Sequence, residues 1–137
     1  MVSEETLMES AKAMLAMSYA PYSHFHVGAA LLAKDGRVFT GCNVENAAYG
    51  PSNCAERTAF FKAVSEGARE FTKIVIVGGK DGVMGEMCPP CGVCRQVMRE
   101  FCDPETFEIL CPAADGSVTR FRLKDLLPES FGPANIT

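Results

Sequence analysis

Hydrophobic residues recur along the chain in patterns that predict a series of helices and strands. Near the N-terminus they are spaced by three or four positions, at Leu7, Met8, Ala11, Met14 and Leu15. This spacing predicts a helix that begins after Ser3, a suitable N-cap, and runs to about Met17. Glu4 and Glu5 suit the positive end of such a helix.

Continuous apolar runs follow, and these are typical of strands. "VGAALLA" (27–33) and "RVFTGCNV" (37–44) are joined by a segment with Asp35-Gly36, a pair that marks a hairpin turn. "KIVIVGG" (73–79) is apolar throughout and contains no helical spacing, which predicts a buried strand. Two closing strands are predicted at "TFEILCP" (106–112) and "VTRFRL" (118–123).

Two further helices are predicted between these strands. One covers about residues 54–67, with Ser52 or Asn53 as its N-cap. The other has Pro90 as its first residue and ends near Phe101, because proline is favoured in the first helical turn.

The order of these elements predicts the fold class. The order α-β-β-α-β-α-β-β, with a short helix near "KDLLPES" after the last strand, indicates a three-layer α/β/α sandwich around a mixed sheet. At 137 residues the chain is expected to form one domain, 1–137. Sites in such folds gather where strand ends meet helix starts.

Charge and cysteine content narrow the function classes. The net charge of -4 and the scattered Lys and Arg residues argue against a nucleic-acid partner. The acidic start "MVSEETLMES" lacks an export signal, and "VGAALLA" is far shorter than the about 20 residues of a membrane span. Seven cysteines without an export signal therefore favour metal ligands or buried thiols in a reducing cytoplasm.

Three of the thiols fall at predicted helix starts. Cys91 and Cys94 share one first turn, and Cys54 opens the other helix, where partial positive charge favours thiolates. Three thiolates suit Zn²⁺ and leave a fourth position for water, as in catalytic zinc sites. Glu56 lies two residues after Cys54 and could take a proton from that water.

Three thiolates leave such a zinc centre with a net negative charge, which makes a bound water less acidic. The guanidinium groups of Arg57 and Arg95 could donate hydrogen bonds to the sulfurs and offset this charge.

Spacing alone leaves other interpretations open. With Cys88, the series Cys88-x₂-Cys91-x₂-Cys94 could form a closed four-cysteine zinc site with Cys54, or begin an iron–sulfur run. A redox dithiol is a further alternative. The remaining thiols are expected to be small buried hydrophobes: Cys42, Cys102 and Cys111.

The quoted motifs resemble a known family. "NCAERTAF" with "PPCGVCRQV" resembles the paired zinc motifs of nucleoside deaminases. "YAPYSHFHVGAALL", "GCNVENAAYG" and "LLPESF" are similar to the small cytidine deaminases, over residues 19–131. Cys88 departs from the family as an extra thiol, and Pro89 replaces a residue that usually has a free N–H.

The resemblance implies a mixed five-stranded sheet, a zinc cofactor and a set of site residues. The implied zinc ligands are Cys54, Cys91 and Cys94, and the implied proton shuttle is Glu56. The implied substrate contacts are Asn43 and Glu45 on the ribose, Phe25 on the pyrimidine and the Ala55 N–H on the base carbonyl. Tyr49 and Phe131 match residues that reach a neighbouring subunit of a homotetramer.

The implied activity is hydrolytic deamination of cytidine and 2′-deoxycytidine, in pyrimidine salvage, through zinc-bound hydroxide and a glutamate proton shuttle. A blasticidin-type deaminase is the alternative within this chemistry, although "NVEN" suits an ordinary ribose. Nucleic-acid-editing deaminases usually have histidine at the position of Cys54. A metal-stabilised binding module or an electron carrier is the non-deaminase alternative.

Overall fold

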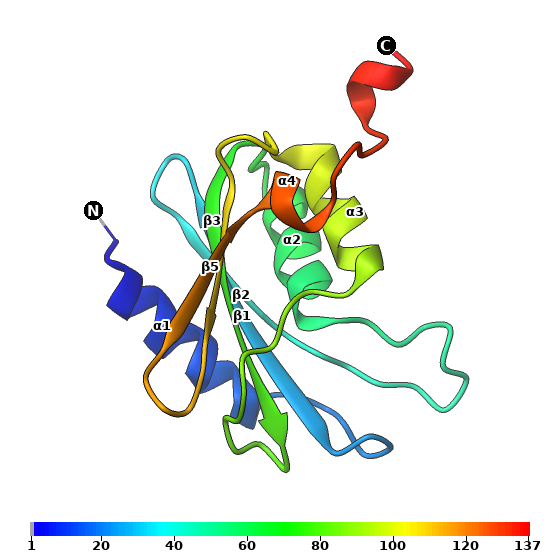
Figure 1. Cartoon of the computed structure of the whole chain (residues 1–137). Helices are drawn as coiled ribbons and strands as arrows, with labels where there is room; N and C mark the ends of the chain where they lie inside the picture. The colour runs from blue at the N-terminus through cyan, green and yellow to red at the C-terminus, as the bar shows by residue number, and fades with distance from the viewer. Residues whose placement is uncertain (1) are drawn as a thin grey trace.

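A mixed five-stranded sheet forms the centre of the computed structural model, which describes residues 2–137 (Figure 1). Its order is β2-β1-β3-β4-β5. The strands are β1 (Phe25–Ala33), β2 (Val38–Cys42), β3 (Phe71–Lys80), β4 (Glu108–Pro112) and β5 (Val118–Arg122). β3 and β4 are parallel and the other neighbours antiparallel, which confirms the expected mixed sheet.

Helices cover both faces of this sheet, and the three-layer prediction is confirmed. The helices are α1 (Glu4–Ala13), α2 (Ala55–Ser65), α3 (Gly92–Phe101) and α4 (Leu123–Leu126), with 3₁₀ turns at Met14–Ala16 and Pro133–Asn135. Figure 1 shows α1 on one side of the sheet and α2 and α3 on the other. Among residues 2–137 no helix has the length and apolarity to cross a membrane.

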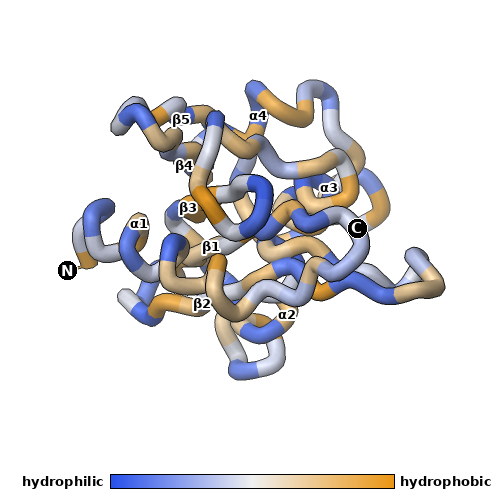
Figure 2. The backbone as a smooth tube through the Cα atoms, turned by 90° about the horizontal axis from the view of Figure 1, so that it is seen from below, coloured by the Kyte–Doolittle hydropathy of each residue, from blue (hydrophilic) through white to orange (hydrophobic). Residues whose placement is uncertain are grey.

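The alternation of side chains along β1 explains why helices cover both faces of the sheet. Ala29 and Leu31 are fully buried on the side of α2, in a cluster that includes Phe60. Ala30 faces the other way, into a second cluster with Leu7 of α1. Figure 2 shows the strands in hydrophobic colours through the middle of the molecule, with hydrophilic colours in the outer turns. Because both faces are buried, the strand reads as a continuous apolar run.

The starts of α2 and α3 differ from the sequence prediction. Cys54 is the N-cap of α2, because Ser52 accepts from the Asn46 N–H and Asn53 donates to Thr58 instead of capping. Cys91 is the N-cap of α3, so Pro90 lies before the helix rather than in its first turn. The first predicted helix also stops short, with α1 ending at Ala13 and a 3₁₀ turn following. Both caps therefore place a thiol at a helix N-terminus.

Gly41 of β2 sets how closely α2 approaches the sheet. A Cβ at this position would lie 2.3 Å from the Ala55 carbonyl oxygen and 2.6 Å from the Ala59 nitrogen. The first turn of α2 therefore rests directly on the β2 backbone. This contact fixes the height of Cys54 and Glu56 above the sheet.

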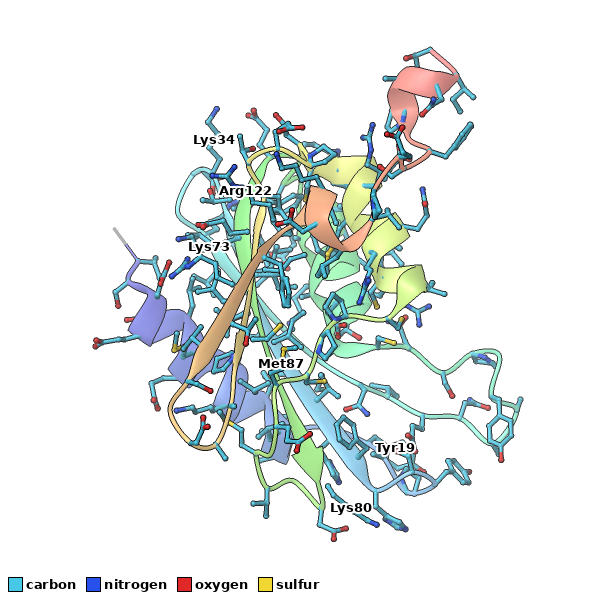
Figure 3. All side chains as sticks on the ribbon, in the orientation of Figure 1. Tyr19, Lys34, Lys73, Lys80, Met87 and Arg122 are labelled. Carbon is cyan, nitrogen blue, oxygen red and sulfur yellow. The ribbon has the colours of Figure 1, made fainter. Side chains whose placement is uncertain are left out.

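Basic side chains are spread over the molecule. Figure 3 shows Lys34 and Lys80 at opposite ends of the sheet, with Lys73 and Arg122 nearer to Lys34. Lys34 pairs with Glu70 and Lys73 pairs with Glu4, so carboxylates accompany these cations. These four cations therefore do not join into one basic surface of the kind that polyanions require.

Candidate metal and substrate site

Three cysteine sulfurs converge where the N-termini of α2 and α3 meet. The Sγ atoms of Cys54 and Cys91 are 3.7 Å apart, and those of Cys91 and Cys94 are 3.5 Å apart. All three lie within 4.8 Å of one another. A tetrahedral zinc with Zn–S bonds of about 2.3 Å requires sulfur separations of about 3.8 Å. The thiol set therefore fits a zinc ion and confirms the predicted convergence of these three cysteines.

Hydrogen bonds favour a thiolate at Cys54. The hydrogen bond with Cys94, and after it the hydrogen bond that Arg57 donates from Nη2 to Sγ over 3.2 Å, together lower the pKa of Cys54 to about 5. The bond between the two thiols, together with burial, raises the pKa of Cys94. Metal binding requires deprotonated sulfurs. Arg57 therefore stabilises the charge that the ligand set carries.

Arg95 does not contact the sulfurs, and its suggested role is wrong. Its Nε donates to the Pro90 carbonyl oxygen and its Nη1 to the Leu126 carbonyl oxygen, both over 2.8 Å. Arg95 therefore ties the loop before α3 to α4. It supports the thiol loop through backbone geometry rather than through charge.

Glu56 is the single charged residue among the buried positions of residues 2–137, with 4% of its surface exposed. Burial raises the pKa of Glu56 to about 7, and the charge of Cys54 adds to this effect. A carboxyl group that changes protonation near neutral pH can both accept and return a proton. Its place in the first turn of α2 brings this group to the wall of the cavity described next.

A cavity of about 670 Å³ opens beside the thiols. Cys54, Cys91, Glu56 and Arg57 line it, and Ala55 lies beside them at the start of α2. The predicted substrate contacts Phe25, Asn43, Glu45 and Tyr49 line it too. The structure thus collects residues from the start of β1, the loop after β2 and two helix starts around one volume.

Phe131 lies outside this cavity. It belongs to the tail after α4, where its carbonyl oxygen accepts from Gln96 Nε2 over 2.8 Å. Figure 1 shows this C-terminal segment extending away from the rest of the fold. The Phe131 ring is 60% exposed. Within one chain, Phe131 therefore does not line the cavity.

Cys88 lines the cavity but is not part of the three-sulfur cluster. Its Sγ lies over Gly78 of β3, 3.0 Å from where a Cβ would stand on that glycine. Burial raises the pKa of Cys88 to about 11, with smaller contributions from Glu56 and Cys54. The structure therefore does not build the closed four-cysteine site. Three other thiols are buried as predicted: Cys42, Cys102 and Cys111.

Asn43 and Glu45 line the cavity and also hold the start of β1 and the segment just before it. Asn43 pairs with the backbone of Phe25 and Val27. The Glu45 carboxylate accepts the backbone N–H groups of Tyr22 and Ser23 over 3.0 and 3.1 Å. Ser23 also donates its hydroxyl to Glu45 and, more than the other contacts, holds the pKa of Glu45 below its usual range.

Sequence reasoning missed the two serines that bond these residues. Ser18 donates to Asn43 Oδ1 over 2.5 Å, and Ser23 donates to Glu45. Each bond spans more than twenty residues of sequence, so no local pattern could have revealed it.

The fold and the thiol set together define a zinc-binding α/β domain with a buried carboxyl at its site. The region described as "Cytidine and deoxycytidylate deaminase zinc-binding region" matches residues 1–109. The chain belongs to this family of enzymes, and its cofactor is Zn²⁺.

Cytidine deaminases from other organisms are similar in sequence to most of this chain. The chain is 44% identical to a cytidine deaminase of Sporosarcina psychrophila, over 98% of this chain and 94% of the relative. It is 48% identical to a cytidine deaminase of Halalkalibacterium halodurans, over 83% of each. The crystal structure of cytidine deaminase from Burkholderia pseudomallei superposes with a TM-score of 0.86, at 48% identity, covering 95% of this chain and 100% of that one.

Proposed function

We propose that the protein hydrolyses cytidine and 2′-deoxycytidine to uridine and 2′-deoxyuridine, with release of ammonia. The observation that carries this proposal is the buried carboxyl of Glu56 in the same cavity wall as a three-sulfur zinc site. The relatives named as cytidine deaminases support it.

The chain's own groups supply the proton transfers. When bound, zinc supplies a Lewis acid that makes the attacking water more acidic. Glu56 accepts a proton as this water attacks C4 of the base, and delivers that proton to N3. It then carries the remaining hydroxyl proton to the amine, so that the C4–N bond breaks, ammonia leaves and a C4 carbonyl forms. Burial suits Glu56 to both directions of transfer, because its pKa is near 7.

The other cavity residues fit the parts of a nucleoside. The Ala55 N–H belongs to the first turn of α2, where backbone donors lack helical partners, and it can hold the carbonyl oxygen of the base. Phe25 lines the cavity with an exposed ring that can pack on the pyrimidine. Asn43 and Glu45 lie along the same wall and can bind the ribose hydroxyls.

The charges around the cavity favour a nucleoside over a nucleotide. Apart from the cysteine ligands, the charged residues that line it are Glu45, Glu56 and Arg57, and Arg57 is bonded to Cys54. A 5′-phosphate would therefore meet carboxylates without a free cation. We expect cytidine to be turned over much faster than its 5′-monophosphate.

Assembly into a homotetramer is part of the proposal. Tyr49 lines the cavity with 75% of its surface exposed, and Phe131 is also exposed but is not among the residues that line the cavity of its own chain. Exposed aromatic side chains of this kind are typical of subunit contacts. We propose that Phe131 of one subunit completes the site of a neighbour, in a cytoplasmic enzyme of pyrimidine salvage.

An ultraviolet absorbance assay tests the activity. Purified protein is incubated with cytidine, 2′-deoxycytidine, cytidine 5′-monophosphate or blasticidin, before and after removal of zinc by a chelator. The proposal expects turnover of the two nucleosides, its loss with the chelator and its return with added zinc. Turnover of blasticidin without turnover of cytidine would contradict it, as would full activity in zinc-free protein.

A further inference from the structure

We propose that Arg99 and Gln96 of α3 are positioning residues for Phe131, and that they hold its ring where it enters the cavity of a second copy of this chain. This inference rests on the proposed function, which assigns Phe131 to the site of a neighbouring subunit. Neither Arg99 nor Gln96 lines the cavity of its own chain, so any effect on the reaction must pass through another residue.

Two side chains of α3 bond the C-terminal tail at Phe131 and just before it (Figure 1). Gln96 Nε2 donates to the Phe131 carbonyl oxygen over 2.8 Å, and Arg99 Nε donates to Ser130 Oγ over 2.9 Å. Gln96 and Arg99 are three positions apart, so they project from the same face of the helix. The backbone at Phe131 is therefore bonded to α3, whereas its side chain remains exposed.

The Arg99 guanidinium also packs on the main chain of the tail. Gly132 is buried, and a Cβ on it would lie 2.5 Å from Arg99 Cζ and 2.6 Å from Arg99 Nη1. Glycine thus leaves room for the guanidinium to rest on the backbone. Beyond this contact, the Gly132 N–H donates to Asn135 Oδ1 over 2.7 Å, and the Asn135 N–H donates to the Gly132 carbonyl oxygen over 2.9 Å. Segment 130–135 therefore has its own hydrogen-bonded conformation and is joined to α3.

The turn that leads into the tail has an unusual backbone conformation. Glu129 has a φ of 51°, in the left-handed region that residues other than glycine rarely adopt. Such a conformation persists where surrounding contacts determine it, and it is found often beside functional positions. The bonds from α3 to Ser130 and Phe131 follow directly after this residue and are contacts of that kind.

The ring of Phe131 is the apolar group that this anchored segment presents. It belongs to neither core cluster of residues 2–137, so the anchoring does not serve to bury it in its own chain. A large aromatic ring on a fixed backbone loses little conformational freedom when it enters a pocket of a partner. A second copy offers such a pocket, because Phe25, Val27 and Val93 give the cavity wall an apolar part.

A double-mutant cycle tests whether Arg99 acts through Phe131. We measure kcat and KM for cytidine in the wild type, Arg99→Gln, Phe131→Ala, the double variant and Arg37→Gln. Arg37 is the matched control, because it pairs with Asp35 in the β1–β2 turn. Phe131→Ala should raise KM about tenfold and Arg99→Gln about three- to tenfold, with kcat within about twofold, because packing on bound nucleoside is uniform binding.

The double variant decides the outcome of the cycle. It should be no worse than Phe131→Ala, since removing Arg99 costs nothing more once the ring is absent. Arg37→Gln should match the wild type. Additive losses in the double variant, or a wild-type KM in Arg99→Gln, would overturn the inference. Ser130→Ala removes the partner of Arg99 without altering α3, and its loss should likewise disappear in the Phe131→Ala background.

A defect within the same chain must also be separated from one in its neighbour, because α3 begins at the zinc ligands Cys91 and Cys94. Co-expression of Arg99→Gln chains with Glu56→Gln chains does so, since Glu56→Gln keeps the tail but lacks the proton shuttle. Activity per Arg99→Gln chain should rise in the mixed assemblies, because about half of its sites then receive a correctly held Phe131. Unchanged activity would place the defect in the same chain and contradict the inference.

A binding measurement distinguishes failure of this inference from failure of the proposed function. The chain contains no tryptophan, so Phe131→Trp provides a single fluorescent reporter. Bound uridine should shift its emission to shorter wavelength, and the shift should be lost when Arg99→Gln is added. That result without deamination of cytidine by the wild type would contradict the proposed function alone. Deamination by the wild type with a reporter that does not respond to uridine would contradict this inference alone.

Discussion

Arg57 donates a hydrogen bond from Nη2 to the sulfur of Cys54 over 3.2 Å, and both residues belong to the start of α2. One cation thus accompanies a ligand set of three thiolates around Zn²⁺. We expect Arg57→Gln to lower zinc affinity by about 10- to 100-fold, the usual effect of removing a group that bonds a ligand. Chelator competition measures this. Arg69→Gln is the control, because Arg69 follows the same helix and bonds only backbone carbonyls. Equal zinc affinity in both variants would show that Arg57 has no such role.

Glu56 should be required for turnover but not for metal binding. Glu56→Gln keeps the size of the side chain and removes its ability to accept a proton, so activity on cytidine should fall by at least about 10³-fold. Zinc content should stay at the wild-type value, because the three sulfurs are untouched. Glu66→Gln, at the exposed end of the same helix, should retain full activity. Wild-type turnover by Glu56→Gln would exclude the proposed proton transfers.

Cys88 and Cys91 should respond differently to the same substitution. Cys91→Ala removes one of the three clustered sulfurs and should abolish stoichiometric zinc binding. Cys88→Ala should keep one zinc per chain, since the Cys88 sulfur packs on Gly78 outside the cluster. Metal analysis of the two purified variants makes the comparison. Loss of zinc from Cys88→Ala would mean that this thiol is a fourth ligand after all.

The Glu4 carboxylate joins α1 to the far edge of the sheet. It bonds Arg120 over 2.7 Å and Lys73 over 2.8 Å, and these contacts, with that of Arg120 the larger, lower the pKa of Glu4 from 4.5 to about 2. Because the folded state has the lower pKa, this stabilisation is present above about pH 4.5 and is lost as the pH falls toward 2.

Glu4→Gln should therefore be less stable than the wild type at pH 7 by about 1–2 kcal/mol, a value reduced for the partial exposure of the carboxylate. The difference between the two proteins should shrink as the pH falls from about 4.5 to about 2. Urea unfolding at several pH values measures it. Glu9→Gln is the matched control, since Glu9 pairs with Lys12 on the exposed face of α1. A difference that persists unchanged at the lowest pH would rule out the carboxylate charge as its source.

Local sequence signals were sufficient to predict the strands of the sheet and the three cysteines of the metal site. "KIVIVGG" marks β3 because both faces of that strand are buried, and the three thiols lie at helix starts where the fold brings them together. The predicted N-cap of α2 was wrong because serine and asparagine are the usual caps, whereas Cys54 occupies that position. The predicted start of α3 at Pro90 was wrong because Cys91 is its N-cap.

Contacts between segments that are distant in the sequence determine the features that the sequence did not predict. The Leu126 carbonyl that binds Arg95 is 31 residues away, and the Asn43 amide that binds Ser18 is 25 residues away. Cys88 lies three residues before Cys91, the spacing expected of a metal ligand, yet the path of its loop over β3 directs the sulfur to Gly78. Such outcomes depend on packing, which hydrophobic periodicity and motif spacing do not encode.

Gly41 should couple the packing of α2 to catalysis. In Gly41→Ala the new methyl group would overlap the Ala55 carbonyl oxygen and the Ala59 nitrogen, both backbone atoms that cannot rotate away. Relief requires α2 to move off β2, and we expect a stability loss of about 1–3 kcal/mol. Because α2 also carries Cys54 and Glu56, activity on cytidine should fall by more than the folded fraction explains.

Gly85→Ala is the matched control for this substitution, because a Cβ there meets no atom within 4 Å and should change stability by less than about 0.5 kcal/mol. Thermal unfolding and kcat/KM measured on the same preparations separate the two effects. If Gly41→Ala were destabilised yet retained the wild-type kcat/KM at a temperature where it is fully folded, the close contact of α2 with β2 would serve stability alone. A drop in both quantities would show that the position of the α2 start above the sheet is what places Glu56 for proton transfer.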